Sequence, residues 1–134
     1  AHGEVFRRRK LMTFLLIFLG SGIGGVLRYS LGMAVQRLAN GWLFPVGTLA
    51  VNVLGCFLIG LLGQILEAKG LSADLRIFLL IGLLGGFTTF SSFGYETLQL
   101  LRDGQYLYAA LNVVLQVVLG LLFAWLGYLV GRLV

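Results

Sequence analysis

The stretch that decides the fold is GLLGGFTTFSSFGYE, residues 82–96. It begins with apolar residues, as a membrane-spanning helix would, but the adjacent glycines Gly85 and Gly86 then open a run of threonine, serine and phenylalanine. Each glycine weakens a helix interior by about 1 kcal/mol relative to alanine, and threonine and serine side chains compete for backbone hydrogen bonds. We therefore predict that a helix is broken near residues 85–92.

The whole chain is too apolar for a water-soluble protein. Of its 134 residues, 59% are hydrophobic and 11% are charged, whereas a soluble domain carries about 25% charged residues. This composition indicates an integral membrane protein. The glycines favour close helix packing in lipid, as in the Gly20-x-x-x-Gly24 pattern. The single cysteine, Cys56, excludes an intramolecular disulfide and a cysteine-based metal site, and we interpret it as a small buried side chain.

Charged residues divide the chain into four long uncharged stretches, 11–27, 38–66, 77–95 and 104–131. A spanning helix needs about 20 predominantly apolar residues, and the apolar pattern continues past several of these limits. We predict an all-α membrane protein with four transmembrane helices at 11–35, 43–67, 73–101 and 105–133. The third helix carries the predicted break. Residues 11–134 are expected to form a single transmembrane domain.

Residues 1–10 are expected to form a basic N-terminal tail, which contains RRRK at 7–10. Such a cluster beside a spanning helix is typical of contact with anionic lipid headgroups or of a signal that fixes orientation, so nucleic acid is not an expected partner. Residues 1–3 have the character of an expression remnant, Met12 is a candidate native start, and His2 is expected to be solvated. No cleavage site follows the first apolar stretch, so a signal peptide is not expected.

The loop charges do not favour one orientation. With four spans, both termini and the second loop share one side of the membrane, and the first and third loops share the other. Outside residues 1–10, the basic residues of the two sides are Lys69, Arg76 and Arg132 against Arg28, Arg37 and Arg102. Because loop charges normally set orientation, this balance is compatible, for a chain that starts at Met12, with insertion both ways and pairing as an antiparallel, dual-topology homodimer. Counting residues 7–10 makes the balance seven to three. The alternative is that a small protein has few loop charges.

Acidic residues are not expected in the middle of any span. Glu67, Asp74, Glu96 and Asp103 all fall near predicted helix ends. A proton-coupled carrier needs an ionisable group within the membrane, so this placement argues against a proton-driven pump. The chain also lacks a nucleotide-binding loop, paired carboxylates, a His/Cys cluster and a nucleophile–base pair, so it is not expected to be an enzyme.

Neutral polar residues recur along two of the predicted helices. The row in the second helix is Thr48, Asn52 and Gly55. The row in the fourth helix is Tyr108, Asn112, Gln116 and Gly120. A four-residue step turns a helix by about 40°, so each row stays on one face. Two interpretations remain open: hydrogen bonds that hold helices together in lipid, or a polar track along a narrow path.

A broken helix also has chemistry of its own. It leaves carbonyls without partners at the end of its first half and N–H groups without partners at the start of its second half, and in a membrane these persist only inside protein or beside a wet cavity. Carbonyls suit a cation, and N–H groups and hydroxyls suit an anion. Phe90 and Phe93 share a helix face, and phenyl edges carry partial positive charge. The alternative is a flexible kink packed by aromatic side chains.

These residues resemble a known family, the small bacterial fluoride channels called Fluc or CrcB. The likeness rests on GGFTTFSSF (85–93), GGVLRY (24–29) and GTLAVNVLG (47–55), and it covers nearly the whole chain from residue 11. The resemblance implies a passive, fluoride-selective channel that exports cytoplasmic fluoride across the bacterial inner membrane and so confers fluoride resistance. It also implies an antiparallel homodimer with two pores.

The resemblance further implies the residues of the site. A structural sodium ion at the dimer centre would be held by the backbone carbonyls of Gly85 and Thr88 from each protomer. The implied fluoride pathway comprises Asn52, Phe90, Ser92, Phe93, Tyr108, Asn112 and Gln116. The sequence departs from the family at Asn112 and Gln116, where small hydroxyl residues are expected. Arg28 is a candidate for a vestibule of the pore.

Two other functions are compatible with four short helices. A small multidrug-type, proton-coupled transporter needs a buried glutamate in its first helix, and residues 11–27 contain no acid. A non-transporting scaffold protein fits the glycines but gives no role to the polar residues of 85–93.

Overall fold

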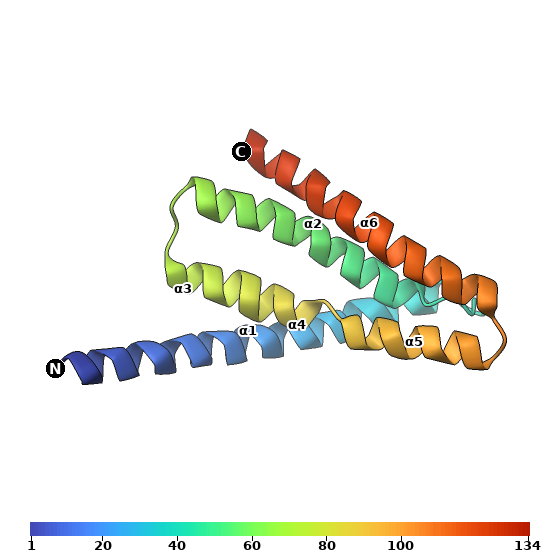
Figure 1. Cartoon of the computed structure of the whole chain (residues 1–134), viewed down its shortest axis with the longest axis horizontal. Coiled ribbons are helices and arrows are strands. Elements are labelled where there is room, and N and C mark those ends of the chain that lie inside the picture. The colour runs from blue at the N-terminus through green and yellow to red at the C-terminus, as the bar shows by residue number, and fades with distance from the viewer.

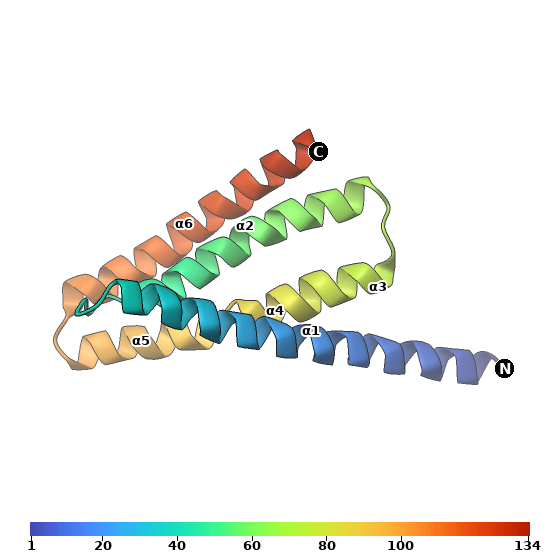
Figure 2. The ribbon, with the colours of Figure 1, turned by 180° about the vertical axis from the view of Figure 1, so that it is seen from behind.

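A computed structural model describes all 134 residues, and its only regular secondary structure is helical. In chain order these are α1 (His2–Leu38), α2 (Val46–Ala68), α3 (Ala73–Arg76), η1 (Ile77–Leu84), α4 (Gly85–Phe87), α5 (Phe90–Arg102) and α6 (Tyr106–Leu133). The element η1 is a π-helix that joins α3 to α4 without a gap. Figures 1 and 2 show the elements as a bundle of long rods, with the third rod made of α3, η1, α4 and α5.

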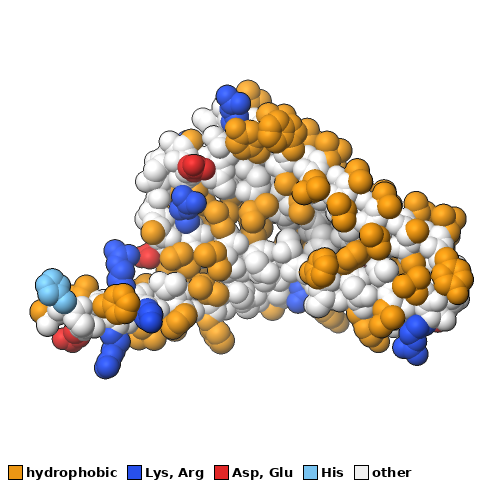
Figure 3. Space-filling view, viewed as in Figure 1, with side chains coloured by type: hydrophobic (Ala, Val, Ile, Leu, Met, Phe, Trp, Pro, Cys, Tyr) orange, Lys and Arg blue, Asp and Glu red, His pale blue; other side chains and the backbone are white.

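Four segments are long and apolar enough to cross a membrane. They are His2–Leu38, Val46–Ala68, Ala73–Arg102 and Tyr106–Leu133. The prediction of an all-α chain with four membrane-spanning helices is therefore confirmed. Orange apolar side chains cover much of the visible face of the bundle (Figure 3), as expected for a multi-pass membrane protein whose solvent is lipid.

Helix α1 is longer than its predicted span. Its 37 residues correspond to a rod of about 55 Å, and its N-terminal part projects beyond the other helices (Figures 1 and 2). The first ten residues, predicted to be a tail, continue α1 as a helix. There Arg8 donates a hydrogen bond to Glu4 at 3.2 Å, and the Lys10 ammonium lies over the Phe6 ring. Contacts one turn apart therefore support the helix in this exposed part.

The third rod changes conformation at two consecutive threonines. Thr88 (φ −85°, ψ 156°) and Thr89 (φ −147°, ψ 115°) are extended between α4 and α5, and the thin ribbon between these helices is visible in Figure 1. The Thr89 hydroxyl caps α5 by accepting a hydrogen bond from the Ser92 N–H at 3.1 Å. The hydroxyl of Thr88 donates to the carbonyl of Leu84 at 3.1 Å. We refer to Thr88 and Thr89 as the extended segment.

Glycines bring the helices together in two tight pairs. In the pair of α2 and α6, a Cβ at Gly127 would overlap the carbonyl oxygen of Phe57. In the pair of α1 and the η1–α4 rod, a Cβ at Gly20 would lie 2.7 Å from the carbonyl oxygen of Phe78, and one at Gly24 would overlap the backbone of Leu83. The predicted packing role of Gly20 and Gly24 is therefore confirmed.

Glu96 lies toward the end of the third span, as expected, but its surroundings were not foreseen. It is six residues, about 9 Å, from the end of α5. Its Oε1 accepts a hydrogen bond from the Thr48 hydroxyl at 2.7 Å, and its Oε2 is buried without a partner. Counting residues from the end of a span gives the depth of an acid, but it does not indicate which face the neighbouring helix covers.

Candidate functional site

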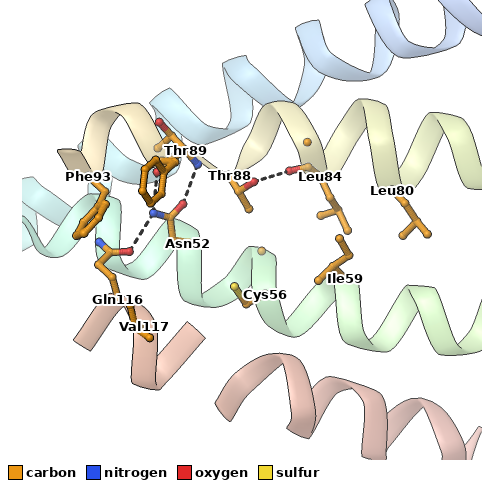
Figure 4. Close-up of a pocket in the computed structure, with 13 residues that line it drawn as sticks. Asn52, Cys56, Ile59, Leu80, Leu84, Thr88, Thr89, Phe93, Gln116 and Val117 are labelled. Atoms are coloured by element: carbon orange, nitrogen blue, oxygen red, sulfur yellow. Dashed lines mark hydrogen bonds between the residues drawn. The ribbon is translucent and has the colours of Figure 1, made fainter. Parts of the chain in front are cut away.

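The extended segment is held by a side chain from another helix. The N–H of Thr89 donates to Oδ1 of Asn52 at 2.8 Å, and Nδ2 of Asn52 donates to the carbonyl of Thr89 at 2.9 Å. Figure 4 shows Asn52 rising from α2 to meet this backbone. An amide side chain suits this position because it offers a donor and an acceptor side by side without charge.

The same asparagine begins a row of hydrogen-bonded amides. Nδ2 of Asn52 also donates to Oε1 of Gln116 at 3.0 Å, Nε2 of Gln116 donates to Oδ1 of Asn112 at 3.5 Å, and Nδ2 of Asn112 donates to Oγ1 of Thr97 at 3.0 Å. We call Asn52, Gln116, Asn112 and Thr97 the amide row. The structure thus brings together three of the residues predicted for the pathway.

Tyr108 does not join the amide row. Its ring packs edge-on against Phe44, with ring centroids 6.0 Å apart and an interplanar angle of 78°, and its hydroxyl makes no hydrogen bond. The four-residue spacing therefore brings Asn112 and Gln116 together but leaves Tyr108 with an aromatic neighbour just before the start of α2.

A groove of about 350 Å³ lies between α2, the η1–α4 rod, α5 and α6. Its lining contains most of the residues predicted for the cation and the anion, namely Asn52, Gly85, Thr88, Phe90, Phe93 and Gln116. The rings of Phe90 and Phe93 lie 5.4 Å apart at 53°, and Phe90 is 83% exposed. The groove therefore combines phenyl rings, amides and helix-end backbone in one place.

A second cavity of about 210 Å³ shares Thr89 of the extended segment with the groove. It is lined by polar groups that include Arg28, Thr48, Thr89, Ser92 and Glu96. Nε of Arg28 donates to the carbonyl of Gly86 at 3.2 Å, so α1 supplies a partner for the carbonyl end of α4. Ser92 and Arg28, both predicted for the site, thus face this cavity instead of the groove.

The chain is similar in sequence to a family of known proteins. Residues 15–128 match the model of the family described as CrcB-like protein, Camphor Resistance (CrcB). The chain belongs to the CrcB family. The fluoride-specific ion channel FluC of Coxiella burnetii (strain CbuK_Q154) is 50% identical over 124 residues, which cover 90% of this chain and 98% of the relative. FluC of Geobacter sulfurreducens is 49% identical over 91% of this chain and 98% of its own length.

The fluoride-specific ion channel FluC of Thermus thermophilus is 50% identical over 88% of this chain and 92% of its own length. The resemblance to the CrcB family seen in the sequence is therefore confirmed. These CrcB relatives are named as ion channels, which agrees with the expectation that the chain is not an enzyme.

Two residues of this candidate site were not predicted from the sequence. Thr97 ends the amide row, and its spacing of seven and four residues from Phe90 and Phe93 on one helix face could have indicated it. Glu96 forms a side-chain pair with Thr48. An acid in so apolar a chain is itself a signal, because a charge within a membrane is costly and needs a polar partner.

Proposed function

We propose that this protein is a fluoride-selective, passive ion channel through which cytoplasmic fluoride leaves the cell across the bacterial inner membrane. The support is the name shared by its relatives, fluoride-specific ion channel, together with one structural observation. Two uncharged amides of the amide row, Asn52 and Gln116, and the Phe90–Phe93 ring pair line the same groove at the extended segment.

The chemistry of this groove suits a small, strongly hydrated anion. Moving a bare ion into a low-dielectric medium costs tens of kcal/mol, so a pore must replace water with other donors. Amide N–H groups and the positive edges of phenyl rings supply such contacts without a fixed charge. A passive pore also needs contacts weak enough for the ion to leave, and the uncharged side chains of the amide row meet that condition.

We infer that the channel is an antiparallel homodimer with two pores. The balanced loop charges support two orientations, and the exposed ring of Phe90 beside an open groove supports a second copy of the chain. The carbonyl end of α4 borders the same groove at Gly85 and Thr88. Lipid offers no hydrogen bonds to these carbonyl groups. Contact with a second protein chain is therefore more favourable for them than contact with lipid.

A structural sodium ion at the centre of that dimer fits the donors present. The end of a helix leaves carbonyl oxygens without intrahelical partners, and Gly85 and Thr88 are at such an end. Carbonyl oxygens at unwound helix ends suit sodium, and no group of three His, Cys, Asp or Glu side chains offers another kind of metal site. When bound, the ion would supply fixed positive charge near the groove.

We further propose that Arg28 belongs to a vestibule at an end of the path. Its guanidinium lines the second cavity next to polar side chains, which suits a vestibule that attracts anions. The exposed basic residues at 7–10 suit contact with anionic lipid headgroups. A proton-coupled multidrug-type transporter is not favoured by the family.

Fluoride efflux from liposomes tests the function. Purified protein is reconstituted at a low copy number per vesicle, and the release of fluoride is followed with a fluoride-selective electrode. We expect fast fluoride release and chloride release at the rate of empty vesicles. Fluoride release no faster than from empty vesicles would overturn the proposal. Efflux that requires a proton gradient would support the transporter instead.

A further inference from the structure

Asn112 is the one fully buried polar side chain of the protein, with no exposed surface. Such an amide is costly in lipid unless its donors and acceptor have partners. Its Nδ2 donates to Oγ1 of Thr97 on α5, and its Oδ1 accepts from Nε2 of Gln116. Thr97 is therefore the only residue of α5 whose side chain forms a hydrogen bond with one of the amides of the row.

Backbone groups at both ends fix the direction of the row. At one end, the hydroxyl of Thr97 donates its only hydrogen to the carbonyl of Phe93 at 2.7 Å, so toward Asn112 it can only accept. At the other end, the N–H of Thr89 can only donate, and it faces Oδ1 of Asn52. Each amide of the row, Asn52, Gln116 and Asn112, must then present its oxygen toward the Thr89 end and a nitrogen toward the Thr97 end.

This direction determines which donors remain for an anion. Both N–H groups of Asn52 are used, by the Thr89 carbonyl and by Gln116. Gln116 and Asn112 each use one N–H within the row, so each retains a second one. Gln116 lines the groove, and in Figure 4 its amide nitrogen lies on the side of Phe93 while its oxygen faces Asn52.

We propose that Thr97 is a positioning residue of the fluoride path, which holds Asn112 and, through it, turns the free N–H of Gln116 toward the groove beside Phe93. The proposal rests on the proposed function and adds a residue outside the groove lining. By the same geometry, Asn52 holds the extended segment and has no free donor for the ion.

The test replaces the hydroxyl of Thr97 and leaves its shape. Thr97→Val removes the acceptor for Asn112, and Thr97→Ser retains it. Thr13→Val is the matched control, because the Thr13 hydroxyl bonds only the Arg9 carbonyl of its own helix. Fluoride efflux and the fluoride-to-chloride ratio are measured in liposomes for each variant, beside wild-type protein and empty vesicles.

We expect fluoride efflux to fall about tenfold in Thr97→Val, the factor that corresponds to one lost hydrogen bond of about 1.4 kcal/mol. The fluoride-to-chloride ratio is expected to fall with it, and Thr97→Ser and Thr13→Val are expected to match the wild type. Wild-type efflux and ratio in Thr97→Val would overturn the role of Thr97. Absence of efflux from the wild type would instead overturn the proposed function, so the two failures are distinct.

A second pair of variants keeps the test decisive if Thr97→Val does not fold because it leaves the buried Asn112 amide without an acceptor. Asn112→Leu removes that amide and introduces no new donor, so the Thr97 hydroxyl has nothing left to orient and Thr97→Val leaves no buried group unpaired in this background. We expect the double variant Asn112→Leu/Thr97→Val to fold and to conduct fluoride at the rate of Asn112→Leu alone. A further loss of efflux in the double variant would show that Thr97 acts by another route and would overturn the proposal.

Discussion

The side chain of Asn52 and the backbone of Thr89 form two reciprocal hydrogen bonds, one in each direction. An amide side chain on α2 thereby gives the extended segment the pairing that a neighbouring strand would give in a sheet. The interruption of the third rod is therefore stabilised by one residue from a different helix.

Replacing Asn52 by leucine is expected to destabilise the folded protein. Leucine has a similar size but leaves the N–H and carbonyl of Thr89 without partners, and an unsatisfied buried group costs about 1–3 kcal/mol. Thermal unfolding in detergent measures the effect as a lower transition temperature. Asn40→Leu is the control, because Asn40 is exposed in a turn. Equal transition temperatures for both variants would contradict this role of Asn52.

Replacing Phe90 by isoleucine is expected to reduce fluoride efflux strongly while the protein stays assembled. Isoleucine keeps the apolar surface but removes the positive phenyl edge. Phe18→Ile is the matched control, since Phe18 is 76% exposed on α1, away from the groove. Efflux is compared with the elution volume in gel filtration. Unchanged efflux in Phe90→Ile would exclude Phe90 from the path.

The glycine contacts predict opposite signs for two alanine substitutions. Gly127→Ala places a Cβ against the carbonyl of Phe57, whereas a Cβ added at Gly63 would have no neighbouring atom within 4 Å. We expect Gly127→Ala to lower the unfolding temperature and Gly63→Ala to raise it slightly, because alanine favours a helix by about 1 kcal/mol over glycine. If both substitutions shifted stability in the same direction, the backbone contact of α2 with α6 would not be limiting.

Exhaustive removal of sodium is expected to abolish efflux and weaken assembly. The protein is exchanged into a buffer in which a large organic cation replaces sodium, and efflux and oligomeric state are followed over days, because a trapped ion leaves slowly. Restoring sodium is expected to recover both. Persistent efflux and assembly in its absence would count against a cation at Gly85 and Thr88.

Charge and hydropathy predicted the four spans because lipid imposes length and composition on each helix. The starts and ends of the helices were predicted less well from the sequence. Helix α1 continues back to His2, because exposed contacts such as Arg8–Glu4 support a helix beyond the apolar stretch. Within the site, spacing along α6 correctly joined Asn112 to Gln116. Spacing along α5 places Thr97 on the face of Phe90 and Phe93, but it does not give the contact of Thr97 with Asn112 or that of Thr48 with Glu96. Contacts between helices depend on how each helix is rotated, which one sequence does not give.

The glycine contact between α2 and α6 also decides how the protein can be recombined with its relatives. Because the backbone at Gly127 already touches the facing helix, α2 and α6 can be exchanged only as one unit. Such a chimera would carry Asn52, Asn112 and Gln116 together and leave Thr97 in the recipient. The contact between the exchanged helices and the rest of the chain is then the hydrogen bond between Asn112 and Thr97. If α2 and α6 came from a relative with hydroxyl residues in place of these amides, residue 97 would also have to change to match them.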